Sequence, residues 1–102
     1  MFTVSSETTN YQLRVSGYSG NIGGDAFRYH DRMMFTTYDR DNDPWTSSAY
    51  KNNCAVFNGG GFWYRACTTS SINTIAGRGD DFDWQYSTNG LKLQTSRMWL
   101  TC

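Results

Sequence analysis

Residues 54–67 read CAVFNGGGFWYRAC, with a cysteine at each end and two apolar runs around Asn58 and three glycines. An Asn-Gly pair followed by further glycine accepts positive φ angles at little cost, which is typical of a β-hairpin turn. Such a hairpin would place Cys54 opposite Cys67, and a disulfide bond there would stabilise a small domain by about 3 kcal/mol. The segment therefore predicts a disulfide-bonded hairpin in a protein of an oxidising compartment.

The sequence has three cysteines, so this pairing leaves Cys102 over. Cys102 is either a free thiol or one half of an intermolecular disulfide bond. No CxxC pair and no histidine cluster accompanies the cysteines, and their spacing favours a structural disulfide over a zinc site.

Short alternating stretches on both sides of this segment predict strands. Apolar and polar residues alternate in 11–15, and a second stretch of this kind covers 33–37. Leu91 and Leu93 alternate with polar neighbours and 98–100 is apolar, which predicts one or two strands near the end. We expect an α+β fold that is mostly strand and loop, with a short antiparallel sheet, long ordered loops and little helix.

Length and charge limit the function. The 102 residues predict a single domain, 1–102, with one core. Nine Lys or Arg balance nine Asp or Glu, so no long-range field favours nucleic acid. No apolar stretch approaches the roughly 20 residues of a membrane span, and the start of the sequence lacks a signal peptide. We expect a soluble protein without membrane insertion, from which any export signal has been removed.

Aromatic residues form 17% of the sequence, beside many Ser, Thr, Asn and Gly. Rings and amides suit the recognition of carbohydrates or peptides, because rings contact apolar faces and amides bind hydroxyl or peptide groups. The alternative interpretation is that the rings form the core.

The segment 39–45, DRDNDPW, carries three carboxylates at alternate positions. Hard oxygen ligands at this spacing suit calcium. The loop is not an EF-hand, since Pro44 and Tyr50 stand where that loop needs Gly and Glu. The alternative is a solvated acidic turn.

The order of four segments, 11–20 (YQLRVSGYSG), 27–43 (FRYHDRMMFTTYDRDND), 53–56 (NCAV) and 62–67 (FWYRAC), resembles the C-terminal half of a fibrinogen-related domain. This domain is the module of fibrinogen, ficolins, tachylectins and other invertebrate fibrinogen-related lectins. The resemblance implies the fold of that family over nearly the whole sequence. It also implies a structural calcium ion bound by the side chains of Asp41 and Asp43 and the carbonyl of Trp45.

The resemblance further implies a ligand pocket beside the calcium site, around Cys67, with a cis Ala66–Cys67 peptide bond. The implied ligand-binding residues are Phe62, Trp63, Tyr64, Arg65, Ala66, Cys67, Thr68, Trp84, Gln85 and Tyr86. Arg65 and Arg78 are candidates for contact with a sialic carboxylate, and the alternative is that each is a surface charge. Because successive residues of a strand face opposite sides, at most two of the three consecutive rings can line a site.

Three departures from the family pattern affect these implications. Thr68 stands where the family commonly has His, so a ring donor is lost. The additional residues 46–53, TSSAYKNN, leave the calcium ligands beyond Trp45 unassigned. The sequence covers about half of the usual domain and is either a fragment or a minimal version. A minimal version would expose a sheet edge, and this predicts a homodimer or larger assembly.

Two remaining features have structural alternatives. Arg78, Gly79 and Asp80 form the tripeptide that integrins recognise, although three residues often match by chance. The single histidine, His30, is predicted to be buried and hydrogen-bonded, and no Ser-His-Asp set accompanies it. We therefore expect no enzyme activity.

These observations predict a secreted lectin of innate immunity that binds terminal sugars bearing N-acetyl groups, sialic acid first among them. The alternative is a protein- or peptide-binding module, of the knob-pocket type of fibrinogen or of the receptor-binding type. Glycan-array binding competed by free sialic acid distinguishes the first from the second.

Overall fold

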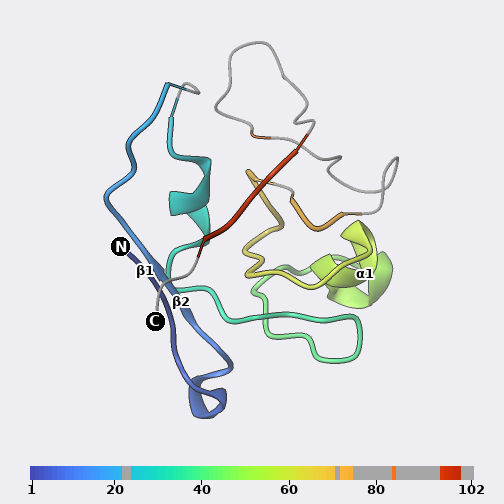
Figure 1. Cartoon of the computed structure of the whole chain (residues 1–102). Coiled ribbons are helices and arrows are strands. Elements are labelled where there is room, and N and C mark those ends of the chain that lie inside the picture. Colours follow the sequence, from blue (N-terminus) through green and yellow to red (C-terminus); the bar gives the residue numbers. More distant parts are fainter. Residues whose placement is uncertain (22–23, 71, 75–83, 85–94, 100–102) are drawn as a thin grey trace.

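The computed structural model describes residues 1–21, 24–70, 72–74, 84 and 95–99 (Figure 1). Two short strands, β1 (Phe2–Val4) and β2 (Leu13–Val15), pair antiparallel with Phe2 opposite Val15 and Val4 opposite Leu13. The strand predicted over 11–15 is therefore confirmed in its last three residues. As expected, the rest of the described structure is mostly loop, with a short antiparallel sheet and little helix.

Four short helical segments complete the described elements. They are the 3-10 helices η1 (Glu7–Thr9), η2 (Ala26–His30) and η3 (Tyr50–Asn52), and the α-helix α1 (Cys54–Asn58). The Asp25 carboxylate begins η2 by accepting the Arg28 N–H at 3.1 Å. Figure 1 shows the β1–β2 pair on one side of the molecule and α1 on the other. Within the part of the protein that is described, no helix is long and apolar enough to cross a membrane.

The hairpin predicted over 54–67 is wrong, because the first five of these residues form α1. The side-chain oxygen of Asn53 accepts the N–H groups of Ala55 at 2.7 Å and Val56 at 3.2 Å, which caps the start of the helix. Gly59 ends the helix in the left-handed conformation, with φ of 85°. An Asn-Gly pair suits a helix end as well as a hairpin turn, because both place Gly at positive φ.

The predicted disulfide bond between Cys54 and Cys67 is nevertheless present, with the two Cα atoms 5.5 Å apart. α1 and the returning backbone bring the two cysteines together without strand pairing between them. Cys54 and Cys67 lie in the core with Ala55, Phe62 and Tyr64. Partly buried side chains surround this cluster: Phe27, Trp45, Phe57, Trp63 and Ile72.

The strand predicted over 33–37 is reduced to two isolated bridges. Thr36 pairs with Phe62, and Thr37 pairs with Arg40 through two backbone hydrogen bonds of 3.0 and 3.2 Å. The Thr37–Arg40 bridge closes a tight turn, and the backbone therefore pairs with Phe62 at Thr36 alone. Of the residues predicted to form strands near the end, Met98 and Trp99 lie in none, while Leu91, Leu93 and Leu100 lie outside the described residues.

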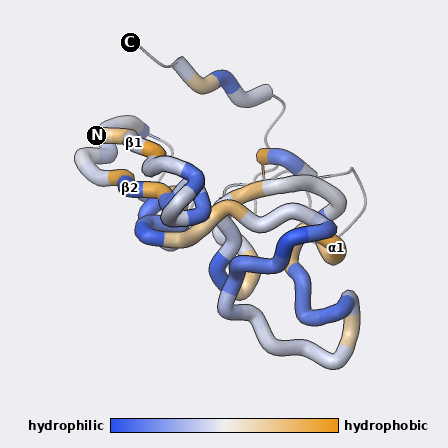
Figure 2. The backbone as a smooth tube through the Cα atoms, turned by 90° about the horizontal axis from the view of Figure 1, so that it is seen from below, coloured by the Kyte–Doolittle hydropathy of each residue, from blue (hydrophilic) through white to orange (hydrophobic). Residues whose placement is uncertain are grey.

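Figure 2 colours the backbone by hydropathy, and apolar residues of β1, β2 and α1 stand out among largely polar loops. In the same view the backbone of 95–99 runs apart from the backbone of the other described segments. These residues are exposed, and they make no hydrogen bond to any other residue that the structure describes.

Candidate functional site

The three consecutive rings of 62–64 alternate between two sides, as the sequence predicts. Phe62 and Tyr64 are 2% and 1% exposed and point into the core beside the disulfide bond. Trp63 is half-buried, and its indole Nε1 donates to the carbonyl of Tyr11 at 2.7 Å. Two of the three predicted ligand-binding rings are therefore core residues.

Arg65 and Ala66 form an exposed tip before the second cysteine. The Ala66–Cys67 peptide bond is cis, in agreement with the implication of the resemblance. The Arg65 N–H donates to the Cys67 carbonyl at 2.8 Å, which closes the turn. The Arg65 guanidinium carbon lies 5.2 Å from the centre of the Tyr29 ring, a cation–π geometry.

Thr68 lies buried beside His30, which is 0% exposed. The Nδ1 atom of His30 lies 2.9 Å from the Trp63 carbonyl, and its Nε2 atom accepts the Thr69 N–H at 3.3 Å. Burial lowers the pKa of His30 to about 4; the Trp63 hydrogen bond acts to raise it, and Arg65 acts to lower it. His30 is thus a neutral, buried ring, which confirms the predicted structural placement.

The structure brings the predicted ligand-binding residues together only in part. Residues 62–68 surround the disulfide bond, but they line none of three open cavities in the described part of the protein. Trp84 lies beside one of these cavities. The remaining residues singled out from the sequence lie outside the described residues: Gln85, Tyr86, Arg78, Gly79, Asp80 and Cys102.

The acidic loop is held in place by Asp43. Its Oδ1 accepts the Trp45 N–H at 3.0 Å, and its Oδ2 accepts the Cys54 N–H at 3.1 Å, so the loop is tied to the start of α1. The Asp43 N–H also donates to the Asp41 carboxylate at 3.3 Å. Burial raises the pKa of Asp43 to about 6; the two N–H donors oppose this shift, and the neighbouring Asp41 adds to it.

The carboxylate oxygens of the acidic loop are the kind of ligand that a hard cation such as calcium prefers. The carboxylates of Asp41 and Asp43 are neighbours, and a cation there would offset their mutual repulsion, which adds to the effect of burial on the Asp43 pKa. Among the residues with described positions, no three His, Cys, Asp or Glu side chains are arranged so that together they could hold a metal ion. A bound calcium ion would therefore need backbone carbonyls, such as that of Trp45, or water.

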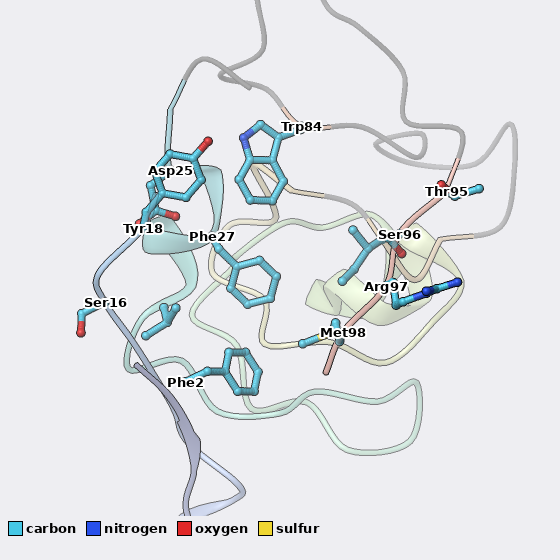
Figure 3. A pocket seen from close by; sticks show the side chains of 12 residues that line it. Phe2, Ser16, Tyr18, Asp25, Phe27, Trp84, Thr95, Ser96, Arg97 and Met98 are labelled. Carbon is cyan, nitrogen blue, oxygen red and sulfur yellow. The ribbon is translucent and has the colours of Figure 1, made fainter. Parts of the chain in front are cut away.

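A cavity of about 380 Å³ lies next to the sheet on the face that carries Phe2 and Val15 (Figure 3). Figure 3 shows Phe2, Phe27 and Trp84 turned toward the same space, with Arg97 and Met98 across from them. Trp84 is fixed by its indole Nε1, which donates to the Gly24 carbonyl at 2.8 Å. We call this space the aromatic cavity. It combines four rings with a few charged groups at its edge: Phe2, Tyr18, Phe27, Trp84, Asp25 and Arg97.

The rings of the aromatic cavity form a connected cluster. The ring centres of Phe2 and Phe27 are 6.0 Å apart, those of Phe27 and Trp84 are 6.4 Å apart, and those of Tyr18 and Trp84 are 6.3 Å apart. The sequence prediction includes Trp84 but misses the other three. Tyr18 and Phe27 belong to segments that carry the family resemblance, yet nothing in their spacing indicates that they meet Trp84.

Comparisons with known proteins agree with this fold. A model of the family described as fibrinogen beta and gamma chains, C-terminal globular domain, matches residues 1–100. The fibrinogen beta chain of Gallus gallus is 35% identical, in an alignment that covers 87% of this protein and 22% of the relative. Angiopoietin-related protein 7 of Mus musculus is 39% identical over 74 residues, which cover 72% of this protein and 20% of the relative.

Two solved structures are similar throughout most of the protein. The fibrinogen-like globe domain of human ANGPTL2 is 36% identical, with a TM-score of 0.73, over 85% of this protein and 41% of that domain. The corresponding domain of human ANGPTL6 is 32% identical, with a TM-score of 0.71, over 84% of this protein and 40% of that domain. The protein thus spans about a fifth of these curated relatives and about two fifths of these solved domains.

Proposed function

Because the protein belongs to the fibrinogen family of C-terminal globular domains, we propose that it is an extracellular protein-binding module without catalytic activity. In this proposal the aromatic cavity holds an apolar side chain of a protein or peptide partner. Secretion is supported by the disulfide bond between Cys54 and Cys67, since such bonds persist in oxidising compartments.

The observation that carries the proposal is the composition of the aromatic cavity. Its volume of about 380 Å³ falls within the range of ligand pockets, and its lining is mostly apolar. The rings of Phe2, Phe27 and Trp84 offer large apolar area for contact, and aromatic side chains of this kind often dominate binding at protein interfaces. Asp25 and Arg97 at the edge are able to fix the orientation of a peptide.

The relatives favour this function over the lectin predicted first from the sequence. These relatives are chains of fibrinogen and angiopoietin-related proteins. The burial of three residues predicted to bind a sugar is a second reason. Phe62, Tyr64 and Thr68, which the lectin interpretation needs around a sugar, are buried. Sialic acid binding therefore enters the experiment below as the competing outcome.

The test is selection from a phage-displayed library of random linear twelve-residue peptides, run beside a glycan array that carries sialylated and N-acetylated sugars. We expect enriched peptides that bind the wild-type protein, and loss of their binding in Trp84→Ala. Tyr38→Ala is the control, because Tyr38 is 78% exposed and does not line the cavity. Trp84→Phe keeps a ring at the site and should retain part of the binding.

Two results would contradict the proposal. Array binding that free sialic acid competes, without any enriched peptide, would support the lectin instead. Equal binding of the peptides by the wild type and by folded Trp84→Ala would remove the aromatic cavity as the site.

We further propose that the acidic loop binds a structural calcium ion through Asp41, Asp43 and the Trp45 carbonyl. The support is the pair of neighbouring carboxylates and the family resemblance of this loop. The ion would supply positive charge that offsets repulsion within the loop, and Asp43 would hold the loop against α1.

A further inference from the structure

A second cavity, of about 500 Å³, lies between α1 and the tight turn of 37–40. It shares no described lining residue with the aromatic cavity, and Figure 1 shows α1 on the side of the molecule opposite the β1–β2 pair. We call this space the α1 cleft. Its lining includes Thr37, Tyr38, Asp39, Lys51, Val56 and the three glycines of 59–61.

Backbone hydrogen bonds fix the walls of the α1 cleft. The Nδ2 atom of Asn53 donates to the Thr37 carbonyl at 3.0 Å, which holds the turn against the start of α1. Thr36 and Phe62 exchange two backbone hydrogen bonds of 2.9 and 3.1 Å, which hold the same turn beside the glycines. The cleft is therefore formed by the fold itself, as most ligand pockets are.

Tyr38 and Asp39 give the α1 cleft a site for a cation. Tyr38 is 78% exposed, and its ring contacts neither a ring nor a cation among the residues that the structure describes. The Asp39 carboxylate accepts the Thr37 hydroxyl at 2.7 Å and forms no ion pair within the same residues. The face of an aromatic ring and a carboxylate both attract an ammonium group.

Lys51 brings a positive charge to the same cleft. It is the middle residue of η3, and the three residues of η3 have φ angles of 52°, 57° and 58°. This left-handed backbone is unfavourable for residues other than glycine, and such strain often accompanies a functional site. The Tyr50 ring, centred 4.9 Å from that of Phe57, anchors η3 to α1. In the described part of the protein Lys51 has no ion-pair partner, so its ammonium group is available to an anion.

We propose that the α1 cleft binds phosphocholine, with the trimethylammonium group against Tyr38 and Asp39 and the phosphate toward Lys51. A quaternary ammonium has no N–H group, so ring faces, apolar contacts and negative charge hold it in place of hydrogen bonds. The Tyr38 ring, the half-buried Val56 and the Asp39 carboxylate supply these three. This site goes beyond the proposed function and does not depend on the aromatic cavity.

The two charges of the cleft favour a zwitterion over a simple ion. A cation would be attracted by Asp39 and repelled by Lys51, and an anion would meet the reverse. Phosphocholine offers both charges in one small molecule. It occurs free and as the headgroup of choline lipids, so the experiment includes both sources.

The test is an NMR titration of the whole, isotope-labelled protein with phosphocholine. Choline and inorganic phosphate serve as half-ligands, because each can use only one end of the cleft. We expect the amide signals of 59–61 to shift and saturate with phosphocholine, and each half-ligand to bind about tenfold more weakly or less. Vesicles of phosphatidylcholine, beside vesicles of phosphatidylglycerol, test the lipid headgroup by co-sedimentation.

Matched variants test the two ends of the cleft. Tyr38→Ala should weaken phosphocholine binding about tenfold, whereas Tyr38→Phe keeps the ring and should stay within about threefold of the wild type. Lys51→Gln should also weaken binding about tenfold, and Lys51→Arg, which keeps the charge, should stay within about threefold. Tyr11→Ala is the control, because Tyr11 is an exposed tyrosine that lines none of the three cavities.

Several results would overturn the proposal. These are shifts that do not saturate, inorganic phosphate that binds as tightly as phosphocholine, and wild-type affinity in Tyr38→Ala and Lys51→Gln. Co-sedimentation with phosphatidylcholine that free phosphocholine competes would support the site and identify the lipid headgroup as a ligand. Binding of free phosphocholine without co-sedimentation would support the site for the soluble molecule alone. Peptide binding that depends on Trp84 is unaffected by any of these outcomes, so the two proposals fail separately.

Discussion

The Nδ1 atom of His30 lies 2.9 Å from the carbonyl oxygen of Trp63, so the single histidine ties η2 to the segment that carries the buried rings. The other ring nitrogen, Nε2, accepts the Thr69 N–H. A neutral ring with its proton on Nδ1 satisfies both contacts. Protonation of Nε2 would remove the acceptor and place a charge in the core.

The first prediction concerns the pKa of His30. Burial lowers this pKa from 6.5 to about 4. Because the sequence has one histidine, its ring signals in an NMR titration are assigned without ambiguity. We expect a midpoint near pH 4, and a midpoint close to the ordinary histidine value would show that the ring is not buried as described.

The same shift predicts how stability depends on pH. The folded pKa of His30 lies below the unfolded value, so its contribution is complete above about pH 6.5 and is lost as pH falls toward 4. The maximum loss is about 3 kcal/mol. Asp43, with its raised pKa of about 6, acts in the opposite sense over part of this range. The measurement is therefore the difference in unfolding free energy between the wild type and His30→Gln, in which the Asp43 contribution cancels; a difference that does not change with pH would contradict the prediction.

The second prediction concerns Asn53, whose side chain stabilises two segments at once. Its oxygen caps α1, and its Nδ2 donates to the Thr37 carbonyl at 3.0 Å and contacts the Tyr38 carbonyl at 3.4 Å. We expect Asn53→Ala to lower the unfolding free energy by about 2–4 kcal/mol, through the lost cap and the lost hydrogen bonds to the two carbonyls. Asn53→Ser keeps a capping oxygen and should lose about 1 kcal/mol less in denaturant unfolding. Equal losses would mean that the cap contributes little.

The sequence predicts the disulfide bond better than the structure around it. The pairing of Cys54 with Cys67 is correct although the segment between them begins as a helix. Two cysteines separated by 13 positions can meet in several local conformations, so their pairing does not depend on the type of turn between them. Asn58 and Gly59, in contrast, fit both a hairpin turn and a helix end, so they do not decide the local structure. The local structure depends on the cap by Asn53, an amide whose role requires contacts with distant carbonyl groups.

The aromatic cavity, in contrast, is not predicted from the sequence. Trp84 is separated from Gly24, its hydrogen-bond partner, by 60 positions, and Phe2 comes from a strand that the sequence does not predict. Local periodicity carries no information about such long-range contacts. Residues 62–64 are easier, because the alternation of side chains correctly separates Trp63 from the buried rings of Phe62 and Tyr64.

The third prediction concerns Gly60. A Cβ atom on this residue would overlap the backbone carbonyl oxygen of Asn73, which cannot move without its backbone. On Gly61 a Cβ atom would instead approach the ring of Phe35 to 2.9 Å, and a ring shifts more easily than a backbone. We expect Gly60→Ala to lower the melting temperature more than Gly61→Ala, with a loss of about 3 kcal/mol or more for the first. Calorimetry of the two variants checks the order, and the reverse order would contradict this packing.

The last prediction concerns calcium at the acidic loop. If Asp41 and Asp43 bind the ion in the folded state alone, calcium at about a hundredfold excess over its Kd should stabilise the protein by about 2.7 kcal/mol, and a chelator should reverse the effect. Asp43→Asn should abolish this difference, because it removes a ligand charge at the residue that ties the loop to α1. Asp39→Asn is the control, since the Asp39 carboxylate instead accepts the Thr37 hydroxyl at 2.7 Å. Melting temperatures that are the same with calcium and with chelator would rule out the site, and loss of the calcium effect in Asp39→Asn alone would move it to a different carboxylate.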